Sequence, residues 1–163
     1  MLEIRKINEK DFEVVSKLNK EIFGTSAMED DVFHDLIFTP HGKYHTYFIV
    51  VTLDNKILGY AGLSYSYERA NIEVLGVDKS ARELGYGIKL IDELYGFTYR
   101  NDIKFLYLNV SVDLKAACQV FQDYGFQIVR INEGFYGDGK DSYFMRKSVD
   151  YDPVVDEREF DYY

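Results

Sequence analysis

A short segment with two glycines carries the clearest chemistry in this sequence. Residues 71–77 are typical of a strand, and residues 86–100 are typical of a helix with apolar side chains on one side. Between them lie Arg82, Gly85 and Gly87. The start of a helix directs backbone N–H groups and a partial positive charge at one place, and glycine lets a bulky anion approach the backbone. The sequence therefore predicts an anion site, suited to phosphate, at the start of this helix.

Two other phosphate-binding motifs do not fit. A dinucleotide-binding fingerprint needs Gly-x-Gly-x-x-Gly, and Leu90 occupies the third glycine position. A P-loop needs Gly-x-x-x-x-Gly-Lys-Ser/Thr, and residues 137–141 lack both the first spacing and the hydroxyl. An ordinary loop before an amphipathic helix remains the alternative to an anion site.

Arg-x-x-Gly-x-Gly after a strand resembles the pyrophosphate loop of the GCN5-related N-acetyltransferases, the GNAT superfamily. The resemblance implies acetyl-CoA as co-substrate. It places the diphosphate at residues 82–88, with Lys79 and Lys89 adding positive charge, and these residues are Arg82, Glu83, Leu84, Gly85, Tyr86, Gly87 and Ile88. In this family two neighbouring strands, here residues 71–77 and 105–110, splay apart and the pantetheine arm lies between them. That implies contacts from Leu75, Gly76 and Val77, and from Lys115 and Phe121 on the next helix.

Composition limits the classes of protein. A chain of 163 residues with 47% apolar residues predicts one folded domain. The net charge of −9 argues against nucleic acid as a partner and suits a cationic substrate such as an amine. The lack of an 18-residue apolar run predicts no membrane span, and residues 1–5 suggest a strand rather than a signal peptide. The single cysteine, Cys118, excludes an internal disulfide and indicates the cytoplasm, and it lies in an apolar helical pattern typical of a packed thiol. The three histidines show no metal-ligand spacing, so no metal is expected.

Hydrophobic periodicity predicts eleven elements along the chain. The expected strands are residues 2–7, 45–53, 56–67, 71–77, 105–110, 126–131 and 142–147, and the expected helices are residues 10–23, 27–38, 86–100 and 114–124. Asn8 is expected to cap the first helix, Asp54 and Asn55 to form a hairpin turn, and Gly125 to end the last helix. This order is similar to that of the GNAT fold, an α/β (α+β) architecture with a mixed, mostly antiparallel sheet of about seven strands, flanking helices and a splayed acetyl-CoA cleft. We expect residues 1–147 to form that domain and residues 148–163 an acidic, tyrosine-rich tail.

The segment of residues 132–145 resembles the end of the protein N-terminal acetyltransferases, a family that includes RimI and the catalytic subunit of NatA. Residues 108–110 and 121–126 are similar to the preceding strand and helix end of that family. The resemblance implies protein N-termini as substrate, with Tyr136 binding the peptide backbone. It also implies that Phe23, Thr25 and Ser26 form the opposite wall. An auxiliary subunit or a homodimer is left open.

The reaction that the resemblance implies is attack of a neutral amine on a thioester carbonyl, which needs a group to remove one proton. The position of the family's base is matched by Asn109, which can hold a water but cannot accept a proton. Glu73 is the substitute that we expect, on the same strand face as Leu75 and Val77; a solvated glutamate without a role is the alternative. Near pH 7 about a tenth of N-terminal amines are neutral, against fewer than about one in a thousand lysines, so a weak base favours N-termini.

We therefore expect an acetyl-CoA-dependent acetyltransferase of protein N-terminal α-amines that works by direct transfer in a ternary complex. Two alternatives stay open. One is an acetyltransferase of lysine or of a small-molecule amine. The other is a weakly catalytic acyl-CoA-binding module, because both usual proton carriers of the family are replaced, at Asn109 and Phe121.

Overall fold

The computed structural model describes residues 1–136 and 139–154, apart from the side chains of Phe135 and Tyr136. Seven strands form one sheet in the order β1-β2-β3-β4-β5-β7-β6. The strands are β1 (Leu2–Lys6), β2 (His45–Leu53), β3 (Lys56–Ser66), β4 (Arg69–Val77), β5 (Phe105–Ser111), β6 (Gln127–Tyr136) and β7 (Lys140–Ser148). All neighbours are antiparallel except β4 and β5, which are parallel. The expected mixed, mostly antiparallel sheet is confirmed.

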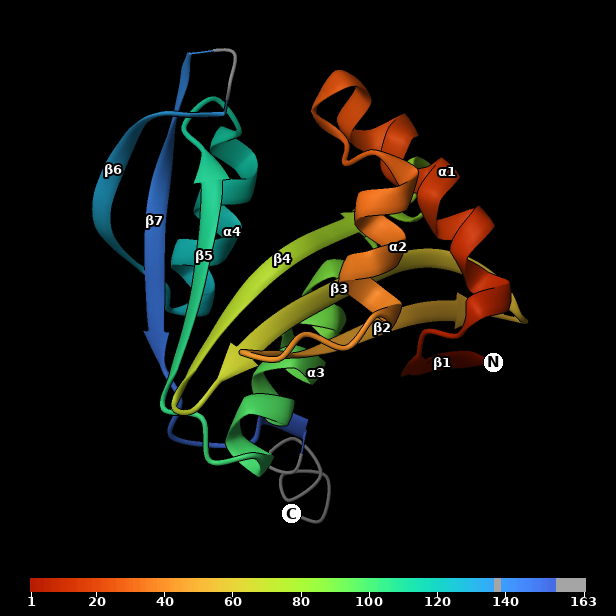
Figure 1. The fold of residues 1–163 in the computed structure, drawn as a ribbon, viewed down its shortest axis with the longest axis horizontal. Coiled ribbons are helices and arrows are strands. Elements are labelled where there is room, and N and C mark those ends of the chain that lie inside the picture. Colours follow the sequence, from red (N-terminus) through yellow and green to blue (C-terminus); the bar gives the residue numbers. More distant parts are fainter. Residues whose placement is uncertain (137–138, 155–163) are drawn as a thin grey trace.

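Four α-helices cover the sheet unevenly (Figure 1). They are α1 (Phe12–Phe23), α2 (Asp30–Phe38), α3 (Tyr86–Arg100) and α4 (Lys115–Tyr124). Apolar side chains of α3 and α4 pack with all of β2–β5 and β7 on one face, whereas those of α1 and α2 pack on the other face, against β2, β3 and β4. Within residues 1–136 and 139–154, no helix covers that second face over β5, β7 and β6, and we call this part of the sheet the open face.

Most element boundaries agree with the sequence prediction. The N-cap role of Asn8 is confirmed, because its side chain accepts from the Lys10 amide and Asp11 accepts from the Asn8 amide, at the start of a short 3₁₀ turn (Glu9–Asp11) before α1. Asp54 and Asn55 both have positive φ, as a tight hairpin turn between twisted strands requires. The predicted start of α2 at Ala27 is wrong by three residues. The extended Glu29 precedes the helix, and Asp30 and Asp31 occupy its first turn, where a helix favours negative charge.

The two halves of the sheet separate between β4 and β5. Parallel pairing joins only Arg69–Ile72 to Phe105–Leu108, although both strands continue beyond it. Figure 1 shows the two strands diverging toward the end where β4 leads into α3. The β4–β5 splay is the predicted one, and it leaves residues 73–77 of β4 without a strand partner on that side.

The chain after β7 packs against α3 rather than leaving it at once. Asp152 is only 5% exposed and accepts from the Arg100 guanidinium at 3.1 Å, while the Tyr95 hydroxyl contacts Asp150 and the Ser148 carbonyl. In the described part of the chain no helix is long and apolar enough to cross a bilayer.

Candidate active site

The loop between β4 and α3 is ordered by its own polar groups. Asp78 caps a short 3₁₀ turn (Lys79–Ala81), accepting from the Ser80 amide and hydroxyl at 2.9 Å each. These hydrogen bonds hold the pKa of Asp78 below its usual value. Ala81 is buried, and the Nε of Arg82 donates to the Val77 carbonyl at 3.3 Å. The loop therefore keeps Arg82 beside the end of β4.

The backbone turns at Gly85 to start α3. Gly85 is the N-cap with φ of +82°, in the left-handed region, and a Cβ built there meets no atom within 4 Å. Glycine is thus required by conformation and not by space. A Cβ on Gly87 would lie 3.8 Å from Val77, which shows that the first turn of α3 packs on the end of β4. The first N–H groups of α3 have no acceptor within the helix, so they point their partial positive charge at the end of the splay.

Three consecutive residues of β4 form one side of the splay. Leu75 and Val77 pack into the core beneath α3, and Gly76 is buried. A Cβ on Gly76 would lie 2.6 Å from the hydroxyl of Tyr60, whose ring is buried and which donates to Asn19 at 2.5 Å. Backbone groups here that do not face β3 have no strand partner, so they are available to a ligand that lies in the splay as a strand would.

The orientation predicted for Glu73 is wrong. A β-bulge between β3 and β4 pairs Gly62 with Val74 and Leu63 with Ile72, so Glu73 is an extra residue with no partner. The bulge reverses the alternation of β4. Ala70, Ile72, Leu75 and Val77 all pack on the α3 side, whereas Glu73 accepts from Ser64 at 2.6 Å and from Asn71 at 3.3 Å on the other side. Glu73 is exposed there, next to the open face.

Asn109 lies on the same side of the sheet, on the other arm of the splay. Its side-chain oxygen accepts from the side-chain NH₂ of Asn132 at 3.0 Å and from the Ser142 hydroxyl at 3.4 Å. Because that oxygen already has two donors, the group that Asn109 can offer a ligand is its NH₂. Sequence reasoning missed Asn132, Ser142, Ser64 and Asn71, since strand register brings them here and no local motif marks them.

The two predicted peptide walls stand on either side of the splay (Figure 1). Phe23 ends α1 and is 37% exposed, and the exposed Thr25 and Ser26 belong to a 3₁₀ turn (Gly24–Ser26) that begins with φ of +56°. On the opposite side, Tyr136 ends β6, but its side chain lies outside the described residues.

Helix α4 carries the two other residues for which a cofactor contact was expected, Lys115 and Phe121. Lys115 is its exposed first residue, and the preceding Leu114 offers no side-chain cap. Phe121 packs edge-on against Phe126 with ring centroids 5.8 Å apart, in contact with the core. Cys118 is buried, and burial raises the pKa of its thiol, as expected for a packed cysteine.

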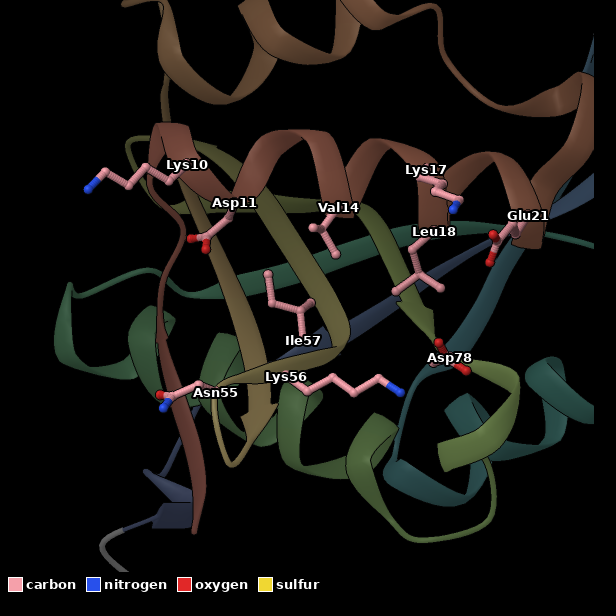
Figure 2. Close-up of a pocket in the computed structure, with 10 residues that line it drawn as sticks. All are labelled: Lys10, Asp11, Val14, Lys17, Leu18, Glu21, Asn55, Lys56, Ile57 and Asp78. Atoms are coloured by element: carbon pink, nitrogen blue, oxygen red, sulfur yellow. The ribbon is translucent and has the colours of Figure 1, made fainter.

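A separate cavity of about 440 Å³ lies under α1 (Figure 2). Lysines and carboxylates alternate around it, including Lys17, Glu21, Lys56 and Asp78, over an apolar floor of Leu18 and Ile57. It shares with the β4–α3 loop only Asp78, whose carboxylate is engaged in the loop. Its mixed charge and its place on the α1 side distinguish it from the predicted anion site.

Comparisons with known proteins agree with this geometry. Residues 1–126 match the model of the acetyltransferase (GNAT) family. The chain is 28% identical over 141 residues to N-alpha-acetyltransferase RimI of Mycobacterium tuberculosis, covering 81% of this chain and 83% of RimI. Its fold is that of Ard1 from Thermoplasma volcanium (TM-score 0.82, 24% identity, 92% of this chain and 99% of Ard1). It is also that of Arabidopsis thaliana NAA60 crystallised with acetyl-CoA (TM-score 0.78, 20% identity, 91% and 99%).

Acetyl-CoA, the co-substrate of this family, fits the residues present here. The unpaired edge of β4 suits a pantetheine arm, and the open backbone at Gly85 with Arg82 beside it suits a diphosphate. The anion site had been predicted from Arg82, Gly85 and Gly87, and the splay had been expected from the family resemblance. The chain belongs to the GNAT acetyltransferase family and is an acetyl-CoA-dependent N-acetyltransferase.

Proposed function

We propose that this enzyme acetylates the α-amine of protein N-termini by direct transfer from acetyl-CoA. The observation that carries the proposal is the placement of Glu73 and Asn109 on one side of the sheet, on opposite arms of the splay. An amine entering from that side meets one carboxylate and one amide NH₂, while the loop at Arg82–Gly87 lies at the end of β4. The relative RimI, whose name gives its activity as α-amine acetylation, supports the same assignment.

The site has few side chains that can accept a proton, and that favours an α-amine over lysine as the substrate. Glu73 is exposed and already accepts two hydrogen bonds, and Asn109 cannot accept a proton at all. Such a site depends on an amine that is neutral before it binds. About a tenth of N-terminal amines are neutral near pH 7, whereas lysine, with a pKa near 10.4, is almost fully charged. Glu73 then takes the proton released after attack, directly or through one water.

The position of the cysteine thiol supports direct transfer. The chain has one cysteine, and Cys118 is buried with its Sγ 3.5 Å from the Ser111 carbonyl. Burial raises its pKa and so lowers the fraction of thiolate, which makes an acetyl-cysteine intermediate unfavourable. We therefore assign a ternary complex of enzyme, acetyl-CoA and peptide. Phe23, Thr25 and Ser26 on one side and Tyr136 on the other are the proposed peptide walls.

The test uses the purified chain with acetyl-CoA and a library of lysine-containing peptides, each made with a free and with a blocked N-terminus. We expect mass spectrometry to place the acetyl group on the free α-amine, and blocked peptides to remain unmodified. Acetylation of lysine in both sets, or of small amines alone, would contradict the proposal. Repeating the assay over a range of protein concentrations, and after gel filtration, separates a chain active alone from one that needs a homodimer or an auxiliary subunit.

A further inference from the structure

A row of arginines and aromatic rings crosses the sheet beside the candidate active site. The Arg69 guanidinium carbon lies 4.6 Å from the ring centre of Tyr107, and that of Arg130 lies 4.5 Å from the ring centre of Phe144. Tyr107 and Phe144 stack with centroids 5.2 Å apart and planes 10° apart. The four residues come from β4, β5, β7 and β6, one from each strand. We call them the arginine–aromatic row.

The row lies on the open face, except for Arg69 on the neighbouring β4, and beside the candidate active site. Tyr107 is in register with Asn71, which donates to Glu73, and Phe144 is in register with Asn109. The packing of α1 and α2 stops at β4, so no helix of the described residues lies over the row. A cavity of about 740 Å³ runs alongside it, lined by the β3–β4 hairpin (residues 64–71), Tyr44, Tyr107 and Phe144.

The charge of the row is unpaired in the described residues. Neither Arg69 nor Arg130 forms an ion pair with a carboxylate there, and the same holds for Arg146, which lies over the Phe105 ring at 5.4 Å on the same face. These three arginines concentrate positive charge on one face of a chain whose net charge is −9. A guanidinium stacked on a ring still presents N–H groups along its edge, and that edge matches a carboxylate. The Nε of Arg130 already donates to the Asn132 side chain at 3.0 Å, so its two NH₂ groups are what Arg130 can offer to a ligand.

We infer that the arginine–aromatic row binds an acidic segment of the substrate polypeptide, just downstream of the acetylated N-terminus. The inference rests on the proposed function. The three spacings along the row, each near 5 Å, add up to a length that about four residues of extended chain cover. Separate carboxylates suit the row better than a nucleic acid does. Glu68 and Glu73 border it, and the overall negative charge of the chain repels a continuous polyanion.

The test compares peptides that share an efficiently acetylated N-terminal tripeptide followed by four glutamates or by four glutamines. At low salt we expect the acidic peptide to have the lower KM, and the Arg69→Gln/Arg130→Gln variant to raise that KM about tenfold. The KM of the glutamine peptide should stay the same. Because Arg130 donates to Asn132, which donates to Asn109, kcat is compared between the two peptides, and it should be equal for both. The matched control is Lys10→Gln/Lys17→Gln, which removes the same charge from exposed positions on the α1 side and should change neither KM.

Equal KM values for the two peptides, or an equal loss for both in the arginine variant, would refute the inference and leave the proposed function intact. Tighter inhibition by a single-stranded RNA than by the acidic peptide would also refute it. A variant that ends at Val154 gives a third outcome. If its KM for the acidic peptide is lower than that of the full chain, the chain's own acidic tail occupies the row and competes with the peptide, and the inference is refuted. If no peptide is acetylated, the proposed function fails, and fluorescence anisotropy with an N-terminally blocked acidic peptide tests the row alone. If the unaltered enzyme binds this peptide and the arginine variant does not, the inference is supported. If the unaltered enzyme does not bind it, the inference is refuted.

Discussion

Replacing Gly85 by alanine isolates the backbone conformation on which the anion site depends. Gly85 has φ of +82°, and an added Cβ meets no atom within 4 Å. Gly42 is a matched control, because its surroundings are equally open but its φ is not positive. Both substitutions reduce the conformational entropy of the unfolded chain by a similar amount, worth about 0.4–1 kcal/mol. Only Gly85→Ala also carries the penalty of a left-handed L-residue, about 1–2 kcal/mol.

The two variants should therefore differ in free energy of unfolding by about 1–2 kcal/mol, which is roughly 2–8 °C in Tm for a domain of this size. The loop can relieve the strain only by rotating, and that turns the first N–H groups of α3 away from the ligand. We expect calorimetry to show CoA binding weakened by up to about 5- to 30-fold for Gly85→Ala and unchanged for Gly42→Ala, because strain that the loop relieves by rotating is lost from affinity instead of from stability. Equal Tm values and equal Kd values for CoA in the two variants would refute the reasoning.

Three further predictions concern single side chains. Glu73→Gln should lower kcat about 100-fold or more while leaving the calorimetric Kd of CoA unchanged; an unaltered kcat would remove Glu73 from proton transfer. The hydrogen bond from Arg5 holds the pKa of Asp11 below its usual value. The ionised Asp11 therefore contributes its full stabilisation of the fold above about pH 4, and this contribution is lost as the pH falls through the lowered pKa of the folded state. Urea unfolding of Asp11→Asn should accordingly show a loss of about 1–3 kcal/mol at pH 7 that shrinks at pH 3, whereas the same loss at both would exclude the ion pair as its cause. Cys118→Ala should retain kcat, and iodoacetamide should alkylate the native thiol slowly because burial raises its pKa. Abolished transfer in Cys118→Ala, in a variant that still folds by circular dichroism, would point to an acetyl-cysteine intermediate.

The parts of the fold set by local chemistry could be predicted from the sequence. Helix α3 begins and ends where expected, because Gly85 marks its start by conformation and the apolar period continues to Arg100. The hairpin at Asp54 and Asn55 and the C-cap at Gly125, with φ of +117°, are equally local. The β4–β5 splay came from the family resemblance rather than from periodicity.

The parts set by register between distant strands could not be predicted. Asn132 and Ser142 reach Asn109 only because β5, β7 and β6 align in one register. The arginine–aromatic row depends on the same alignment across four strands, and no spacing along the chain indicates it. Side chains that meet across a sheet are neighbours in space whose distance in sequence is arbitrary.

The bulge at Glu73 was, by contrast, visible in the sequence as a change of phase. Along β4, Ala70 and Ile72 follow one alternation, but Leu75 and Val77 follow the other, and only an extra residue between them puts all four on one face. Removing the bulge would exchange the buried faces of residues 74–77. That would take Leu75 and Val77 out of the core beneath α3. Both are half-buried, so each loses less than the roughly 1.5–3 kcal/mol that a fully buried side chain of this kind contributes.

The same extra residue links the fold to the proposed chemistry. Without it, β4 would continue as a regular strand. Glu73, Leu75 and Val77 would then share one face, and Ile72 would lie on the other. With it, the β4 segment that borders the splay buries its apolar side chains beneath α3 and presents one carboxylate toward Ser64 and Asn71, next to the open face. Core packing therefore fixes the position of Glu73, and a substitution such as Leu75→Ala should move this carboxylate as well as destabilise the core. We expect that variant to lose kcat although the backbone groups that residue 75 offers to acetyl-CoA are kept, and a fall in Tm with kcat intact would separate the two roles.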